Sequence, residues 1–221
     1  MIAPDALDLH PHRPDEISVP VPDTALDPEL RARLRGCTVA IIGCGGLGSN
    51  VAEMLVRSGI GRLTLVDFDV VDERNLNRQF FFRDQIGMPK VTALAENLQR
   101  IRSDVRLDLL QDRVTPENLL SIVKGACAIV EAVDEAETKA MIVNTCLAEV
   151  PDVPLVTASG LAGYGSTNAI VTECMADNLY VVGDLTSDVR DGHPLFASRV
   201  MAAAAAQAHA VVRVLLGFRE P

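Results

Sequence analysis

Tryptophan is absent from this chain, and aromatic residues make up only 4% of its 221 residues, whereas hydrophobic residues make up 48%. We therefore expect a core built mostly from Ala, Val, Leu and Ile. Positive charge is also scarce, since the chain has 20 Lys and Arg against 30 Asp and Glu, which gives a formal net charge of −10. Because non-specific binding to nucleic acid or to a membrane surface needs excess positive charge, we expect neither as a partner. A small basic pocket is compatible with this balance.

The cysteines include no CxxC pair, and their number, five, is odd. Three of them lie in or next to apolar segments, so we expect reduced thiols in a cytoplasmic protein rather than a disulfide framework. The N-terminus is acidic and has no apolar stretch of the secretory type, which agrees with that expectation. The longest uncharged apolar stretch, residues 200–212, is mostly Ala and too short to span a bilayer. The cysteines are Cys37, Cys44, Cys127, Cys146 and Cys174.

Proline is concentrated at the N-terminus, where residues 1–28 hold six of the twelve prolines and two of the four histidines. This density disfavours a core element, so we predict an arm over residues 1–28 and a single folded domain over residues 29–221. His10 and His12 are metal-ligand types, but no further Cys or His lies nearby, and a solvated tail is the favoured interpretation. A short helix is then indicated by its cap, its first-turn proline and its terminal glycine, at Asp27, Pro28 and Gly36.

From residue 38 onward, apolar strand patterns alternate with helical patterns. This order predicts an α/β fold of Rossmann-like type, with a parallel sheet covered by helices on both faces. Residues 166–173 and 178–184 alternate like antiparallel strands that extend the sheet, and an Ala-rich helix over residues 196–216 closes the domain. The other predicted strands cover 38–42, 62–67, 105–110, 128–133 and 155–158, and the other helices cover 47–58, 90–101, 116–124 and 136–148.

A glycine-rich turn, GCGGLGSN, follows the first predicted strand and opens a helix. The glycines at 43, 45 and 48 lack a Cβ, so the turn can be tight and its N–H groups can approach a phosphate. The helix N-terminus behind the turn favours negative charge. Asp67 follows the second predicted strand, where an acid is placed to accept hydrogen bonds from ribose hydroxyls. The pattern predicts a nucleotide site and, taken alone, would first suggest NAD.

Polar and basic residues follow Asp69, at the carboxyl end of the second predicted strand, where open α/β sheets bind ligands. Asn75, Arg78, Gln79 and Lys90 are spaced like groups that handle phosphate, with Arg as a planar fork of donors and Lys as a compact charge. A lysine at a helix start opposes the helix dipole, so a bound anion is one reason for its position and a solvated lysine is the alternative. A nucleoside triphosphate needs this cationic set, whereas a nicotinamide dehydrogenase has no obvious use for it.

Five segments are informative together: GCGGLGSN, DFDVVDERNLNRQ, GMPK, VEAVDEAETKA and SGLAGYGSTN. They resemble the ThiF, MoeB and HesA family, bacterial relatives of ubiquitin-activating enzymes, from about residue 33 to residue 217, and most of all its short ThiF-type members. The resemblance implies ATP-dependent adenylation of the C-terminal Gly-Gly carboxylate of a ThiS-like β-grasp sulfur-carrier protein. For the short ThiF type, it further implies a part in thiamine thiazole biosynthesis, a homodimer and a separate sulfur donor protein.

The resemblance also assigns roles to the matched residues. Asp67 would bind ribose, Asp134 would hold Mg²⁺, and Gln79 belongs to the nucleotide-binding motif. Attack of a carboxylate on an α-phosphate brings two anions together, so cationic side chains and Mg²⁺ must offset the repulsion. The glycines that would line the phosphates are Gly43, Gly45, Gly46 and Gly48, and the residues that would contact the triphosphate and the transition state are Asn75, Arg78 and Lys90.

The chain departs from the fuller family pattern in its cysteines. Longer members carry two CxxC pairs that hold structural zinc, and residues 173–184 contain none, so we expect no zinc. Many also carry a cysteine on a long crossover loop, and the matching stretch, residues 185–199, has none. We therefore interpret Cys174 and Cys44 as packing residues rather than nucleophiles. Some members borrow an arginine from the other subunit. The candidates here are Arg31, Arg33 and Arg35, and the alternative is that these side chains only form the solvated face of a short helix.

Three other functions remain open at this stage. A tRNA-modifying dehydratase of the same family would activate a carboxylate on a nucleoside, and it should show a basic face. A nicotinamide-dependent oxidoreductase would use the glycine turn and Asp67 but leave Arg78 and Lys90 unexplained. The inactive half of a heterodimeric activating enzyme should lose phosphate contacts, whereas this chain keeps Arg78, Lys90 and Asp134 together.

Overall fold

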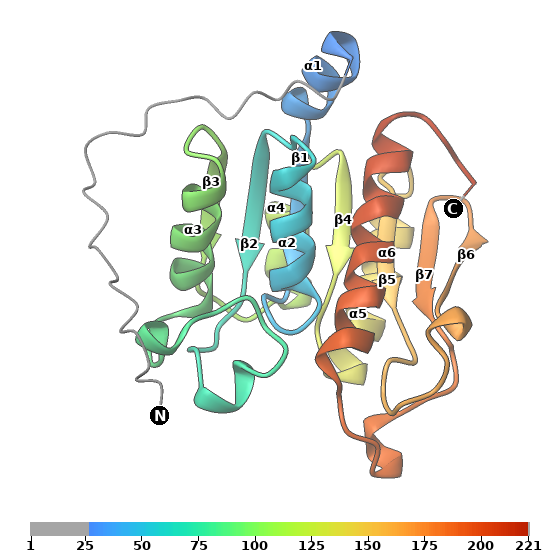
Figure 1. Ribbon diagram of the computed structural model, residues 1–221. Helices are drawn as coiled ribbons and strands as arrows, with labels where there is room; N and C mark the ends of the chain where they lie inside the picture. Colours follow the sequence, from blue (N-terminus) through green and yellow to red (C-terminus); the bar gives the residue numbers. More distant parts are fainter. Residues whose placement is uncertain (1–26, 221) are drawn as a thin grey trace, which may run out of the picture.

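A seven-stranded sheet runs through the residues that the computed structural model describes, 27–220 (Figure 1). Its strands are β1 (Thr38–Ile42), β2 (Arg62–Val66), β3 (Arg106–Leu110), β4 (Ala128–Glu131), β5 (Leu155–Ala158), β6 (Val171–Ala176) and β7 (Leu179–Gly183). They lie in the order β3-β2-β1-β4-β5-β7-β6, and every pair is parallel except β6 with β7. The carboxyl ends of the parallel strands therefore share one edge of the sheet, the lower edge in Figure 1.

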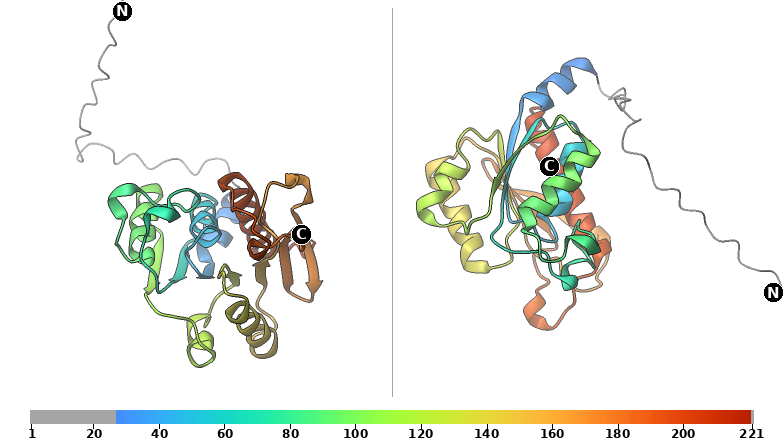
Figure 2. Two further views of the ribbon diagram at one scale, coloured as in Figure 1. Left: turned by 90° about the horizontal axis from the view of Figure 1, so that it is seen from below. Right: turned by 90° about the vertical axis from the view of Figure 1, so that its left-hand side faces the viewer.

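Helices cover both faces of this sheet, as Figure 2 shows from below. The helices α2 (Gly48–Arg57), α3 (Lys90–Ile101) and α6 (Ala197–Leu215) pack on one face, and α4 (Pro116–Ile122) and α5 (Ala136–Glu149) on the other. A shorter helix, α1 (Pro28–Gly36), precedes β1. Single 3₁₀ turns η1 (Glu73–Asn75), η2 (Arg83–Gln85), η3 (Thr167–Ala169) and η4 (Val189–Asp191) lie in the connections.

Two apolar clusters fill the space between the helices and the sheet. In β1, Val39 and Ile41 belong to the cluster beneath α2, α3 and α6, whereas Ala40 and Ile42 belong to the cluster beneath α4 and α5. All four are buried, which explains why this strand is a continuous apolar run rather than an alternating one. Within residues 27–220, no helix is long and apolar enough to cross a membrane.

The predicted Rossmann-like α/β fold is confirmed, and most element bounds agree within two residues. The main difference is the antiparallel pair, where β6 begins at residue 171 rather than 166. The preceding residues form η3, in which the Ser166 hydroxyl oxygen accepts from the Asn168 N–H at 3.2 Å. A tight turn joins β6 to β7, and Asn178 takes a φ of 63° there, a conformation that Asn tolerates.

The predicted N-terminal arm, with His10 and His12, lies outside the described residues except for its last two positions. Of these, Asp27 caps α1 by accepting a hydrogen bond from the Glu29 N–H at 2.8 Å, and Pro28 begins the helix. The predicted helix cap and first-turn proline are thus confirmed, and helical structure starts at residue 28, the last residue that was assigned to the arm. The division into an arm and a domain remains a prediction.

Candidate functional site

A cleft of about 710 Å³ opens at the carboxyl ends of the parallel strands. β1 has β2 on one side and β4 on the other, so the connections that follow β1 and β4 separate here, which is where open α/β sheets place ligands. Two predicted site residues, Gly48 and Asn75, lie outside the lining. The other eight line it together: Gly43, Gly45, Gly46, Asp67, Arg78, Gln79, Lys90 and Asp134.

Some glycines of the turn permit close packing, and others face the cleft. Gly43 has a φ of 96°, and a Cβ there would lie 2.6 Å from the Ala132 carbonyl oxygen. A Cβ on Gly48 would lie 1.8 Å from the Gly43 carbonyl oxygen, so this residue permits close packing of α2 on the turn. Gly45 and Gly46 instead face the cleft, where their nearest neighbours include the side chains of Gln79 and Arg78.

Two buried polar residues of α2 hold the glycine turn in place. The Ser49 hydroxyl donates to the Gly45 carbonyl at 2.6 Å, and the Asn50 amide donates to the Gly46 carbonyl at 2.6 Å. The Asn50 amide also donates to the Arg78 carbonyl at 2.9 Å, and the Phe80 N–H donates to the Ser49 hydroxyl oxygen at 3.0 Å. These bonds join the turn to the segment that carries Arg78. Neither role was predicted from the sequence, although two polar residues in the first turn of a buried helix were a signal for them.

Asp67 is buried beneath the turn. One of its carboxylate oxygens accepts from the Cys44 N–H at 2.7 Å, and the other accepts from the Asp69 N–H at 2.8 Å. An ionised carboxylate has about four lone-pair sites, so acceptor capacity remains for ribose hydroxyls. Burial, and then the charge of Asp67, raise the pKa of the Cys44 thiol well above its usual range. That thiol is therefore protonated at neutral pH, as expected of a packing residue.

Lys90 begins α3 and is almost fully buried. Its ammonium group donates to Asp69 at 2.8 Å and lies 4.0 Å from an Asp67 oxygen. These carboxylates supply a counter-charge within the protein, so the unfavourable position at the helix start does not by itself require a bound anion. An ammonium group has three N–H donors, and the two not used by Asp69 are available to a ligand in the cleft.

Arg78 and Gln79 lie beside the cleft face of the turn. The Arg78 guanidinium donates to the Arg74 carbonyl at 3.2 Å and to the Asn77 side chain at 2.7 Å, and its stem passes over Gly46. Gln79 is buried, and its Oε1 atom receives no hydrogen bond from the described residues. An unsatisfied buried acceptor costs about 1–3 kcal/mol, so a donor on a ligand would be favoured at this point.

Asn75 has a structural task in the same segment. Its side-chain oxygen accepts from the Asp72 N–H at 2.9 Å, and its backbone carbonyl accepts from the Arg78 N–H at 3.2 Å. Asn75 therefore shapes the turn that delivers Arg78.

The end of β4 and the loop after it carry one buried acid and one exposed acid. Asp134 is exposed on the cleft, and none of the described residues donates a hydrogen bond to its carboxylate. Glu131, at the end of β4, is fully buried, and it accepts from the Val133 N–H at 2.8 Å and pairs with Lys139 and the Thr157 hydroxyl. Glu131 thus ties β4 to α5 and β5. Glu131 was not predicted from the sequence, because no local pattern marks its partners eight and twenty-six positions away.

Two further contacts shape the walls of the cleft. The Arg113 guanidinium stacks over the Phe68 ring at 3.8 Å from the ring centre, and both residues line the cleft. Asp184, where β7 ends, pairs with Arg199 of α6 and accepts from the Thr186 and Ser187 N–H groups. The turn formed in this way directs residues 187–190 into the cleft.

Metal-ligand clusters and the position of Cys174 bear on whether the described residues could support metal or sulfur chemistry. Residues 27–220 contain no cluster of three His, Cys, Asp or Glu side chains suited to a metal ion. Cys174 lies on β6 at the far edge of the sheet, outside the cleft lining, and its thiol donates to the Ala176 carbonyl at 3.3 Å.

The fold and the cleft are typical of an α/β protein with a nucleotide-binding site. Comparison with known families identifies the family. The chain belongs to the ThiF family, whose model matches residues 22–221. It is 33% identical over 167 residues to the sulfur carrier protein ThiS adenylyltransferase of Bacillus subtilis (strain 168), which covers 72% of this chain and 49% of that protein. It is 36% identical over 127 residues to the tRNA threonylcarbamoyladenosine dehydratase of Escherichia coli (strain K12), which covers 57% and 47%.

The solved structures agree with this assignment at the level of the fold. The E. coli tRNA N6-threonylcarbamoyladenosine dehydratase TcdA in complex with ATP superposes with a TM-score of 0.77 at 23% identity, covering 86% of this chain and 89% of that chain. The aligned region spans about half the length of the two curated relatives described above. The predicted family is therefore confirmed.

Proposed function

We propose that this protein uses ATP and Mg²⁺ to adenylate the C-terminal carboxylate of a small ThiS-like sulfur-carrier protein that ends in Gly-Gly. The observation that carries this proposal is the gathering of Arg78 and Lys90 around one glycine turn, in a cleft that also holds Asp67 and Asp134. Membership of the ThiF family and the similarity to a ThiS adenylyltransferase support it.

The cleft residues fit a nucleoside triphosphate. Gly45 and Gly46 leave room for phosphate at the N-terminus of α2, and Gln79 offers an unused buried acceptor. Asp67 would take the ribose hydroxyls. Asp134 would hold Mg²⁺, a cation that commonly binds through one or two carboxylates together with substrate phosphates and water. Bound Mg²⁺ would supply charge neutralisation at the phosphates.

In the proposed reaction, a carboxylate oxygen of the carrier forms a bond to the α-phosphorus of ATP, and the bond from that phosphorus to the bridging oxygen of pyrophosphate breaks. The products are the acyl-adenylate and pyrophosphate. Both reactants are anions, so the side chains of Arg78 and Lys90 would offset repulsion as they approach and stabilise charge in the transition state. No enzyme nucleophile is needed, and burial raises the pKa of the Cys146 thiol to about 11, so that thiol, like the Cys44 thiol, is protonated at neutral pH.

We further propose that the acyl-adenylate receives sulfur from a separate donor protein, in the biosynthesis of the thiamine thiazole, and that the enzyme acts as a homodimer. Cys174 lies outside the cleft lining, which supports a route that uses no cysteine of this chain. Accordingly, Cys174→Ser should retain adenylation, and metal analysis should find no zinc. A carrier trapped covalently on Cys174, or stoichiometric zinc, would contradict this part of the proposal.

A second candidate is a tRNA-modifying dehydratase that activates a carboxylate on a nucleoside. The similarity to the E. coli dehydratase, in sequence and in fold, favours it. The formal net charge of −10 favours a protein substrate over tRNA.

ATP–pyrophosphate exchange with the full-length chain tests both candidates. We expect exchange that requires Mg²⁺ and a ThiS-like carrier, with the same carrier lacking its last two glycines as the matched control. Asp67→Ala should mainly weaken nucleotide binding, whereas Asp134→Ala should mainly weaken Mg²⁺ dependence and turnover. Exchange that requires a tRNA with a carboxylate-bearing nucleoside, and not the carrier protein, would establish the second candidate instead. Tight NAD binding without ATP binding would overturn both.

A further inference from the structure

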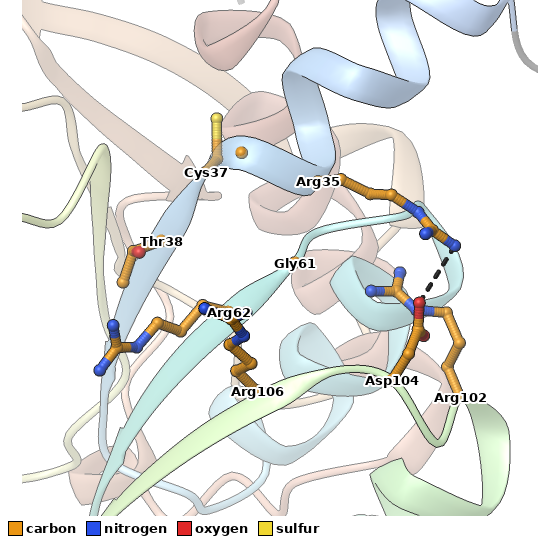
Figure 3. Close-up of a pocket in the computed structure, with 9 residues that line it drawn as sticks. Arg35, Cys37, Thr38, Gly61, Arg62, Arg102, Asp104 and Arg106 are labelled. Atoms are coloured by element: carbon orange, nitrogen blue, oxygen red, sulfur yellow. Dashed lines mark hydrogen bonds and ion pairs between the residues drawn. The ribbon is translucent and has the colours of Figure 1, made fainter.

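Four arginines lie at the opposite edge of the sheet from the cleft, at the amino ends of β1, β2 and β3; Arg35 and Arg102 lie around Asp104, whereas the Arg62 side chain points away from that group (Figure 3). They line a pocket of about 440 Å³, together with Asp104 and the backbone around Gly36 and Gly61. The arginines come from four separate places in the chain, namely α1, the start of β2, the residue after α3 and the start of β3. In that order they are Arg35, Arg62, Arg102 and Arg106.

Two carboxylates pair with three of these arginines. Asp104 accepts from the Arg102 guanidinium at 2.7 Å and lies 3.1 Å from the Arg35 guanidinium. Asp108 accepts two hydrogen bonds from Arg62, at 2.5 and 3.0 Å. Arg102 is also committed to the fold, because it donates to the Val56 and Ile60 carbonyls at 3.1 and 2.9 Å.

The fourth arginine, Arg106, is the surplus charge. Arg62 and Arg106 are register partners on the parallel strands β2 and β3, so their Cα atoms lie about 4.8 Å apart and their side chains leave the sheet on the same face. Like charges placed directly opposite each other destabilise a sheet. Asp108 is engaged by Arg62, and within residues 27–220 no side chain or carbonyl pairs with the Arg106 guanidinium. An excess of positive charge is thus held in one pocket of an acidic chain.

We propose that this arginine pocket binds a small anion that carries two or more phosphate groups. Guanidinium groups match phosphate oxygens with paired hydrogen bonds, and Arg62, which is about half exposed, is the register partner of the exposed Arg106. The volume lies in the range of about 300–1,000 Å³ that is common for small-molecule sites. The lining is charged and polar rather than apolar, which favours a polyanion over an apolar ligand.

This site is separate from the nucleotide cleft. Arg62 begins β2, and Asp67 follows its last residue, so five residues at a rise of about 3.3 Å place the two sites roughly 17 Å apart. The proposal therefore does not rest on the function proposed for the cleft.

Calorimetric titration of the full-length chain with tripolyphosphate, without metal and at low ionic strength, tests the proposal. Tripolyphosphate should enter both sites, so Lys90→Ala provides a background in which the cleft is weakened. In that background we expect one binding event, and adding Arg106→Ala should weaken it about tenfold, as expected for the loss of a charge-assisted pair of hydrogen bonds. Because Arg106 has no partner among the described residues, its removal leaves no carboxylate unpaired.

Arg100→Ala, at an exposed arginine of α3 outside both sites, is the matched control for net charge. It should leave the affinity within about twofold, since exposed charges at a distance are screened. Equal weakening by Arg100→Ala and Arg106→Ala would mean general attraction by positive charge and would overturn the proposal. Loss of all binding in the Lys90→Ala background would overturn it as well. So would binding of a short RNA oligonucleotide through Arg106 when tripolyphosphate does not bind.

Discussion

Replacing Lys139 by methionine leaves the buried Glu131 carboxylate without its cationic partner. Glu131 is fully buried, and its remaining contacts are the Val133 N–H and the Thr157 hydroxyl. Removing one partner of a buried ion pair typically costs about 3–5 kcal/mol, because the remaining charge cannot be solvated. The Lys139 side chain keeps 27% of its exposure, so water can approach the pair. We therefore expect a loss at the lower end, about 3 kcal/mol.

Removing the acid of this pair instead of the lysine should cost less free energy of unfolding. In Glu131→Gln, Lys139 can turn toward water in the cleft, and the glutamine side chain can still accept a hydrogen bond from Val133, so we expect a loss of about 1–2 kcal/mol. The double variant should lose less than the sum of the two single changes, because no unpaired charge remains. Lys139→Arg keeps the charge and is the matched control.

Thermal unfolding followed by far-UV circular dichroism suits this chain, which has no tryptophan for fluorescence. A loss of about 3 kcal/mol should lower the Tm of a domain of this size by about 6–12 °C. Equal losses for the two single variants, or a double variant that loses the full sum, would refute the reasoning that an unpaired buried charge dominates the cost.

Three further predictions concern the cleft and the turn after β7. Arg78→Ala and Lys90→Ala should each lower pyrophosphate exchange by about 10²-fold with the fold retained, in line with losing one charge-stabilising donor; normal exchange in both variants would mean that the site is wrongly assigned. Gly48→Ala should sharply lower the yield of folded protein, because its Cβ would meet the Gly43 carbonyl, whereas Gly45→Ala, whose nearest neighbour is 3.8 Å away, should fold and bind ATP more weakly; similar unfolding of both variants would contradict this division. Burial opposes the ionisation of Asp184, but hydrogen bonds from Ser187 and Thr186 and the contact with Arg199 outweigh it and lower its pKa from 3.8 to about 2. A depressed folded-state pKa contributes stability above about pH 4 that is lost as the pH falls towards 2. Asp184→Asn should therefore lower the free energy of unfolding at neutral pH and make it depend less on pH between about 4 and 2. An unchanged pH dependence in this range would contradict the role assigned to Asp184.

The sequence by itself determined the order of the elements and the place of the cleft. Strand and helix periodicities, together with the cap at Asp27, depend on near neighbours in the chain, so they can be recognised locally. In a parallel sheet the carboxyl ends of the strands share one edge, and the acids and glycines that follow those strands must meet there. Gly45 and Asp67 could therefore be assigned to one site before any contact was known, and the family resemblance added Asp134 to it.

Only the tertiary structure decided how these residues are partnered. Lys90 finds its counter-charge in Asp69, twenty-one residues away, and Glu131 finds Lys139 and Thr157 on two other elements. Neither pairing follows from local pattern, because burial and the distance between strands and helices decide which charge must be satisfied.

The arginine pocket is the strongest case of this kind. Arg62 and Arg106 are forty-four positions apart in the chain and carry no motif, yet the register of β2 and β3 places them side by side. The hydrogen-bonding register of a sheet, set by the packing of the whole domain, is what converts scattered arginines into a charged pocket in an acidic protein.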